Sequence, residues 1–227
     1  MNAEKIKRLL RLLLGLFLYA LGTVFIMRAG LGYGPWEVFQ AGLTNILPIT
    51  IGQSTILVSI VIVAADFLLK EKIGIGTVLN MLLIGLFMDW ILATSLIPSI
   101  SVLWGKGILL IAGLFIIAFG SYFYIGSGFG AGPRDSLMVS IRRYSGLPVG
   151  ISRGILEFCA AAVGYLLGGP LGIGTLLTAF GIGLCIQIVF HLFSFETTQI
   201  VHEDLSETFH LKPAKEAEPP ESDSNNQ

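Results

Sequence analysis

Two carboxylates stand at matching places in two near-copies of one short motif. Residues 30–37 read GLGYGPWE and residues 128–135 read GFGAGPRD, so Glu37 and Asp135 each follow three alternating glycines and a proline. A carboxylate in the first turn of a helix lies beside free backbone amides and the positive end of the helix dipole. Exposed amides of this kind suit small anions or polar solutes. The two carboxylates would repel an anion unless they are protonated or paired with Arg134 or Arg28, so a cation, a neutral polar solute or a proton-coupled substrate is open.

The alternating glycines predict a break in the preceding helix. Each glycine in a helix interior costs about 1 kcal/mol relative to alanine and allows a positive φ. Pro35 and Pro133 have a fixed φ and no N–H group, which suits the first turn of a new helix. The candidate substrate-binding residues of these motifs are Gly30, Gly32, Gly34 and Glu37 in the first copy and Gly128, Gly130, Gly132 and Asp135 in the second.

The helices that follow, residues 36–47 and 134–146, are too short to cross a bilayer. A helix of about 12 residues is about 18 Å long, roughly half of the hydrocarbon core. In one interpretation these are amphipathic helices that lie flat in the two interfaces. In the other they are re-entrant half-helices whose N-termini point at the membrane midplane from opposite sides. The length of the preceding apolar segments favours the flat arrangement, and both remain open.

Four further polar residues in apolar segments are candidates for the same site. Thr77 and Thr175 follow the two GIG sequences at the start of predicted spans, where they either cap the helix or line a pathway. Arg28 and Asp89 are expected at a similar depth near the outer face, so we predict an ion pair between them that acts as a clamp or a gate.

Other charged residues have simpler explanations. Asp66 lies one turn before a lysine and is expected at the inner interface. Arg153 and Glu157 are four residues apart on one helix and are expected to form a local ion pair. The sequence contains no metal-binding motif, no nucleophile with a base and no phosphate-binding loop, so it predicts no enzyme, no cofactor, no metal site and no nucleic-acid partner.

The composition of the chain places these residues in a membrane. The chain has 227 residues, of which 54% are hydrophobic and 13% charged, and its mean hydropathy is +0.80. Such a chain is too apolar for a soluble domain of this size. Apolar segments of about 20 residues, the length that spans a bilayer as a helix, lie near 9–28, 51–69, 75–96, 104–125, 152–168 and 173–193.

The basic residues indicate how the predicted spans are oriented. With the N-terminus in the cytoplasm, all of the 14 lysines and arginines except Arg28 and Lys106 fall on the inner side. We therefore expect both termini in the cytoplasm and the six spans in the inner (plasma) membrane. Residues 1–8 form a basic N-terminus, and residues 196–227 form an acidic tail that is expected to be disordered.

The chain contains an internal repeat. The glycine motifs are 98 residues apart, and GIGTVL at 74–79 returns with that offset as GIGTLL at 172–177, whereas LPI at 47–49 matches LPV at 147–149 with an offset of 100. These matches predict two membrane repeats, residues 9–98 and 104–195. Because each repeat has three spans, the second must enter the membrane from the opposite side. The predicted fold class is an all-α membrane protein of two inverted three-helix repeats, each with a glycine break and a short half-helix.

The paired GxGxGP-x-[E/D] elements, with GxGT at 74–77 and 172–175, resemble the YczE/YitT-type small bacterial membrane proteins. The resemblance covers about residues 10–195. It implies a multi-span bacterial inner-membrane protein, and it implies no biochemical activity.

Two functions from different classes follow from these observations. The first is a transporter or channel-like protein whose small polar solute binds between the inverted halves, with a homodimer enclosing the pathway. The alternative is a non-transporting accessory protein that docks a partner through interfacial helices and the acidic tail.

Overall fold

The computed structural model describes residues 3–195, and this part of the chain is entirely helical. Its eight helices are α1 (Ala3–Ala29), α2 (Pro35–Thr44), α3 (Ile51–Leu68), α4 (Ile75–Ala93), α5 (Leu103–Ile125), α6 (Pro133–Ser145), α7 (Val149–Leu166) and α8 (Ile173–Leu192). All except α2 and α6 are long and apolar enough to cross a bilayer, and these six are the six predicted spans. The predicted tail, residues 196–227, lies outside the described residues.

The centre of the fold is an antiparallel pair formed by α1 and α5. Glycines on both helices allow their backbones to meet. A Cβ atom on Gly15 would lie 2.5 Å from the amide nitrogen of Tyr124, and one on Gly22 would lie 2.6 Å from the carbonyl oxygen of Gly113. Helices in a membrane associate through close packing, which small residues allow, because lipid provides no hydrophobic driving force for association. The buried apolar residues of the core gather on these two helices.

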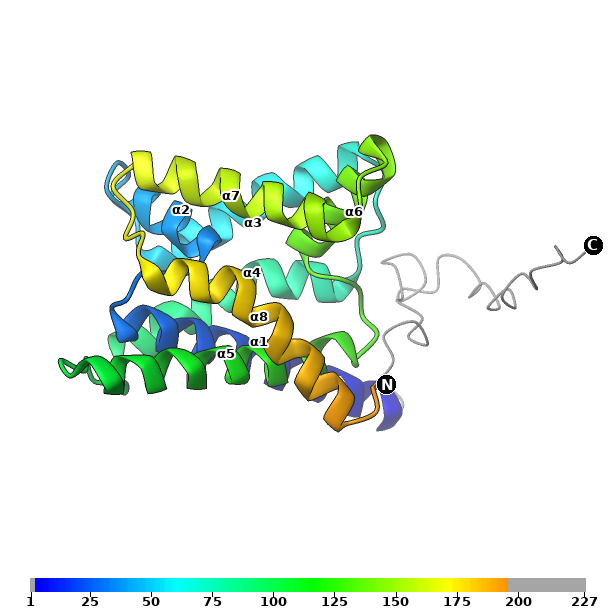
Figure 1. Cartoon of the computed structure of the whole chain (residues 1–227). Helices are drawn as coiled ribbons and strands as arrows, with labels where there is room; N and C mark the ends of the chain where they lie inside the picture. Colours follow the sequence, from blue (N-terminus) through cyan, green and yellow to red (C-terminus); the bar gives the residue numbers. More distant parts are fainter. Residues whose placement is uncertain (1–2, 196–227) are drawn as a thin grey trace, which may run out of the picture.

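The remaining long helices form layers on this pair. Helix α4 packs against α1 and α8 packs against α5, while α3 and α7 lie on the far side of the molecule, as Figure 1 shows. Both short helices pack against long helices. Helix α2 contacts α7 and α3, and α6 contacts α3 and α7.

The two short helices begin inside the molecule and end at opposite ends of it. In Figure 1, α2 runs back toward the end that contains the α1–α2 connection, and α6 runs toward the end where the N-terminus lies. Both helices begin at the proline of the glycine motif, one residue before the predicted starts at 36 and 134. They end at Thr44 and Ser145, slightly before the predicted positions.

The helix starts correct one part of the repeat alignment. Helix α7 begins at Val149, 98 residues after α3 begins at Ile51, so the predicted slip of the offset to 100 is wrong. Pro148 is the N-cap residue of α7, whereas the N-cap residue of α3 is Thr50, two residues after Pro48. The physical reason is that the longer α6 is followed by a shorter connection, so the two LP sequences occupy different places.

The α1–α5 seam gives a first prediction. We expect Gly22→Val to lower the stability of the detergent-solubilised protein by about 1–3 kcal/mol or more, because the new side chain would meet the backbone of α5. The matched control is Gly107→Val, since a Cβ on this helical glycine has no atom within 4 Å. Thermal unfolding of both variants is the measurement, and equal melting temperatures would contradict the close packing of the seam.

Candidate functional site

All eight helices contribute to one cavity of about 120 Å³ between the two halves of the chain. The starts of both short helices line it, with Gly34 to Glu37 on one side and Gly132 to Asp135 on the other. The two predicted carboxylates therefore meet at the same space although they are far apart in the sequence. The other predicted site residues do not line the cavity. These are Arg28, Asp89, Thr77 and Thr175 and the first two glycines of each motif.

Backbone conformation explains the glycines that precede the cavity. The φ angles are +62° at Gly30 and +74° at the equivalent Gly128, and they are +110° at Gly32 and +117° at the equivalent Gly130. Side chains rarely accept such angles, so only glycine makes this turn without strain. The two motifs thus have the same conformation, and each turn brings the next helix start to the cavity.

Each broken segment is held by a helix from the other half of the chain. The Gly174 amide of α8 donates to the Leu31 carbonyl at 2.7 Å, and the Gly76 amide of α4 donates to the Phe129 carbonyl at 2.7 Å. A Cβ on Gly32 would lie 2.6 Å from the Gly172 amide nitrogen, so the approach also needs glycine. Backbone groups freed by the break are satisfied within the protein, as they must be where lipid offers no partner.

The two threonines support this junction. The Thr77 hydroxyl accepts from the Gly74 amide at 3.2 Å and donates to the Ala131 carbonyl at 2.7 Å. The Thr175 hydroxyl accepts from the Gly172 amide at 3.1 Å. The sequence allowed these threonines either to cap a helix or to line a pathway, and their contacts are those of a helix cap.

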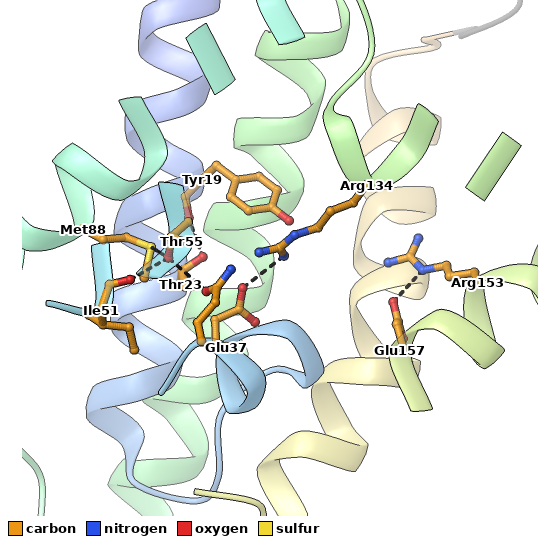
Figure 2. A network of polar contacts seen from close by, with 10 residues as sticks. Tyr19, Thr23, Glu37, Ile51, Thr55, Met88, Arg134, Arg153 and Glu157 are labelled. Atoms are coloured by element: carbon orange, nitrogen blue, oxygen red, sulfur yellow. Dashed lines mark hydrogen bonds and ion pairs between the residues drawn. The ribbon is translucent and has the colours of Figure 1, made fainter. Parts of the chain in front are cut away.

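An ion pair joins the starts of α2 and α6 across the cavity. The Arg134 Nη1 atom lies 3.2 Å from Glu37 Oε1, and the two side chains are 24% and 13% exposed. The same guanidinium lies over the Trp36 ring, 5.0 Å from its centroid. Figure 2 shows Arg134 reaching across to Glu37, with the Tyr19 ring pointing toward the guanidinium. The pair links residues 97 positions apart and neutralises one predicted carboxylate.

Asp135 is held differently from Glu37. Its carboxylate accepts from the Tyr124 hydroxyl at 2.7 Å, and that hydroxyl in turn accepts from the Gly132 amide at 3.0 Å. Asp135 is exposed and forms no ion pair with any residue that the structure describes. A carboxylate without a cationic partner is therefore available at the cavity.

The predicted local pair between Arg153 and Glu157 is confirmed, with Nε and Oε1 2.8 Å apart. Figure 2 shows this pair, and both residues also line the cavity, which their spacing on one helix did not indicate. The lining therefore holds three carboxylates, with Asp135 as the third after Glu37 and Glu157, against the two guanidiniums of Arg134 and Arg153.

The predicted ion pair between Arg28 and Asp89 is wrong. Asp89 accepts from the Thr50 hydroxyl and, at 2.9 Å, from the Gly52 amide, both at the start of α3. Arg28 reaches the Leu92 carbonyl at 3.5 Å. The reason for the difference is that the start of α3 packs directly onto α4 beside Asp89 and supplies uncharged donors there.

The matching family model covers residues 6–191 and is described as a family of unknown function, DUF6198. The chain belongs to this family. It is 34% identical over 181 residues to an uncharacterized protein of Haemophilus influenzae, covering 80% of this chain and 82% of the relative. It is also 35% identical over 175 residues to the uncharacterized membrane protein YczE of Bacillus subtilis, covering 76% and 80%.

A third relative is the uncharacterized protein YyaS of Bacillus subtilis. It is 26% identical over 178 residues, which cover 77% of this chain and 88% of the relative. No solved structure is significantly similar to the chain. Together with the six apolar helices, the relatives identify this DUF6198 member as a multi-pass membrane protein of the YczE type.

Sequence reasoning missed two tyrosines and the burial of one aspartate in this DUF6198 chain. Tyr19 and Tyr124 line the cavity from α1 and α5, but single tyrosines in apolar segments carry no sequence signal for this role. Asp66, which the sequence places at the inner interface, is fully buried in the last turn of α3, and neither of its carboxylate oxygens has a hydrogen-bond partner among the described residues.

Tyr124 gives a prediction that separates its hydroxyl from its ring. We expect Tyr124→Phe to lower stability by about 1–3 kcal/mol, because the Gly132 amide loses its partner in a buried place. Tyr122→Phe is the control on the same helix, since the Tyr122 hydroxyl makes no hydrogen bond within the described residues and its ring stacks on Phe193. Thermal unfolding of the two variants is the measurement, and a stable Tyr124→Phe protein would remove the hydroxyl from the site.

Asp66 gives a second prediction of this kind. Burying an ionised carboxylate without a partner is costly, whereas a neutral side chain of the same shape avoids that cost. We therefore expect Asp66→Asn to leave the melting temperature unchanged or raise it. The control is Glu71→Gln, which weakens an ion pair with Arg143 of 2.9 Å and should not raise stability. A large loss of stability in Asp66→Asn would show that the charged form is needed.

Proposed function

We propose that the chain is a membrane transporter for a small polar solute that binds in the cavity between two inverted three-helix repeats. One observation carries the proposal. Helices α2 and α6 start at the same cavity, and they end at opposite ends of the molecule. Two helix starts that converge on a polar site near the middle of a bilayer are a recurring arrangement in transporters built from inverted repeats.

The contacts of α2 support a re-entrant half-helix over a helix lying flat on the membrane surface. Gln40, in the middle of α2, is fully buried. Its side-chain oxygen accepts from the Thr55 hydroxyl at 3.0 Å and its carbonyl accepts from the Ser54 hydroxyl at 2.8 Å. On another face, Gly164 of α7 meets the backbone of Phe39. A flat interfacial helix would instead expose one whole face to lipid.

The matching junctions of the two halves support the inverted repeat. The bond from Gly174 to Leu31 and the bond from Gly76 to Phe129 have the same length and connect equivalent residues in opposite directions. Each half contributes three of the six spans, so equivalent helices run in opposite directions through the membrane. The positive-inside distribution supports cytoplasmic termini and an inner-membrane location.

The charges of the cavity favour a class of solute. Two carboxylates have guanidinium partners, in Glu37–Arg134 and Glu157–Arg153, while the Asp135 side chain has a polar contact only with the Tyr124 hydroxyl among the residues that the structure describes. The excess negative charge opposes a simple anion and suits a cationic, zwitterionic or neutral polar solute. A cavity of about 120 Å³ limits the bound part of that solute to a small molecule.

The test compares the small-molecule content of a deletion strain with that of strains that express the wild-type chain or the double variant Glu37→Gln/Asp135→Asn. We expect at least one polar metabolite to change on deletion and to be restored by the wild-type chain. The double variant should restore its transport about tenfold less well, because a hydrogen bond to a charged group is worth about 1.5–3 kcal/mol.

Glu4→Gln is the matched control, since Glu4 is exposed in the first turn of α1 and lies away from the cavity. Full restoration by the double variant would remove both carboxylates from the proposed site. A deletion strain with an unchanged metabolite profile would overturn transport and favour the accessory role.

A further inference from the structure

The two halves of the chain differ sharply at one pair of glycines. In the first half, α3 and α4 touch at Gly52 and Gly85, and a Cβ on either residue would run into the carbonyl oxygen of the other. The residues 98 positions later are Gly150 in α7 and Gly183 in α8. A Cβ on either of these would have no atom of the described part of the chain within 4 Å. The same residue type at the same place thus closes a helix contact in one half and faces open space in the other.

A polar latch accompanies the closed contact and is absent from the open one. Asp89 of α4 accepts from the Thr50 hydroxyl and the Gly52 amide of α3. Its equivalent in α8 is Gln187, which is exposed and makes no hydrogen bond through its side chain within the described residues. The side-chain oxygen of Gln187 can accept a hydrogen bond from the backbone N–H of Gly150 if α7 and α8 come together.

A buried serine gives a third difference between the halves. The Ser54 hydroxyl of α3 donates to the Gln40 carbonyl of α2 at 2.8 Å. Its equivalent, Ser152 of α7, is fully buried, and its hydroxyl has no hydrogen-bond partner within residues 3–195. Buried hydroxyls without a partner are rare because they lose their hydrogen bonds to water. With the same offset of 98, the residue of α6 that corresponds to Gln40 is Met138.

The gap between α7 and α8 lies toward one end of the molecule, and the Gly52–Gly85 contact lies toward the other. Figure 1 shows α7 and α8 diverging toward the end where the N-terminus lies, and these two helices barely touch. Gly52, which meets Gly85, lies in the first turn of α3, and α3 begins at the opposite end of the molecule in Figure 1. With the predicted cytoplasmic N-terminus, the molecule is closed toward the outside and open toward the cytoplasm.

We propose that Gly150 and Gly183 form a second gate, which closes when α7 and α8 come together as the Gly52–Gly85 gate opens. The structure described here is the inward-open state, and the alternate state exchanges the conformations of the two halves. This inference rests on the proposed function, because such an exchange alternately exposes a central site to the two sides of the membrane. The second gate assigns a role to Gly150 and Gly183, which weaken their helices and make no packing contact in the inward-open state.

The latches also explain why the inward-open state is the one observed. Asp89 holds the first gate with hydrogen bonds to a carboxylate, which are stronger than the neutral bonds that Gln187 could accept at the second gate. The outward-open state is therefore less populated. A variant Asp89→Asn, which makes the two latches alike, should shift the population toward the outward-open state.

Thiol crosslinking in membranes tests the gate without a known solute. Pro148→Cys and Gln187→Cys are the equivalents of Thr50→Cys and Asp89→Cys, whose native side chains touch. Each pair is placed in a full chain with Cys159→Ala and Cys185→Ala and treated with a short thiol crosslinker. We expect both pairs to link within one chain, with the Pro148–Gln187 positions linking more slowly because the closed second gate is less populated.

The second gate is contradicted if only the Thr50–Asp89 positions link. It is also contradicted if the Pro148–Gln187 positions link only between two chains, because the open glycines would then face another copy. Neither result depends on transport. If the Pro148–Gln187 positions link within one chain while no metabolite responds to deletion, the movement is supported and the transport function is contradicted. If a metabolite responds to deletion but these positions do not link, transport is supported and the second gate is contradicted.

A leucine in place of a gate glycine provides an independent test. Gly150→Leu has room in the inward-open state and should keep the melting temperature, but it should block closure of α7 on α8. The readout is a cysteine at Thr178, which lines the cavity, reacted with a membrane-impermeant thiol reagent outside whole cells, again without the native cysteines. We expect outside labelling to fall by about tenfold or more when one of two states is blocked.

Gly107→Leu is the matched control, because its position is equally open and lies away from both gates. Labelling of the same cysteine in inverted vesicles should remain in both variants, since the cavity is open toward the cytoplasm. Unchanged outside labelling in Gly150→Leu would overturn the proposal.

Discussion

The fold depends on how two breaks in its helices are satisfied away from water. Each glycine motif frees backbone groups in an apolar environment, where an unpaired amide or carbonyl is costly. The Leu31 and Phe129 carbonyls receive the Gly174 and Gly76 amides of helices from the opposite half. The breaks are therefore stable only when the two halves are assembled, so the same bonds that satisfy the backbone also join the halves.

The central cavity is a consequence of these junctions. Because each junction holds the turn before α2 or α6, the first residues of both short helices are delivered to the same space. Their amide ends and carboxylates then share it with arginines from α6 and α7. The ion pair between Glu37 and Arg134 spans the two halves and is held by the same assembly. Polar chemistry and fold stability are thus coupled at one place.

The glycines serve two mechanical purposes. Those of the α1–α5 seam bring two backbones into contact that any larger side chain would separate, which makes this pair a fixed platform. Those at the starts of α3 and α7 and in the middle of α4 and α8 are in contact in one half only. The proposed exchange of the two gates requires a rigid seam of this kind, with outer helices that move against it.

The sequence by itself determined the local features: six apolar spans, the breaks at the glycine motifs and the starts of both short helices. These follow from hydropathy, glycine conformation and proline geometry, which act over a few residues. Only the tertiary structure decided which charges meet. It paired Arg134 with Glu37, gave Asp89 to the start of α3 and buried Asp66. Such contacts join residues far apart in the chain, so they depend on how whole helices pack, and the spacing of residues along the sequence does not encode that directly.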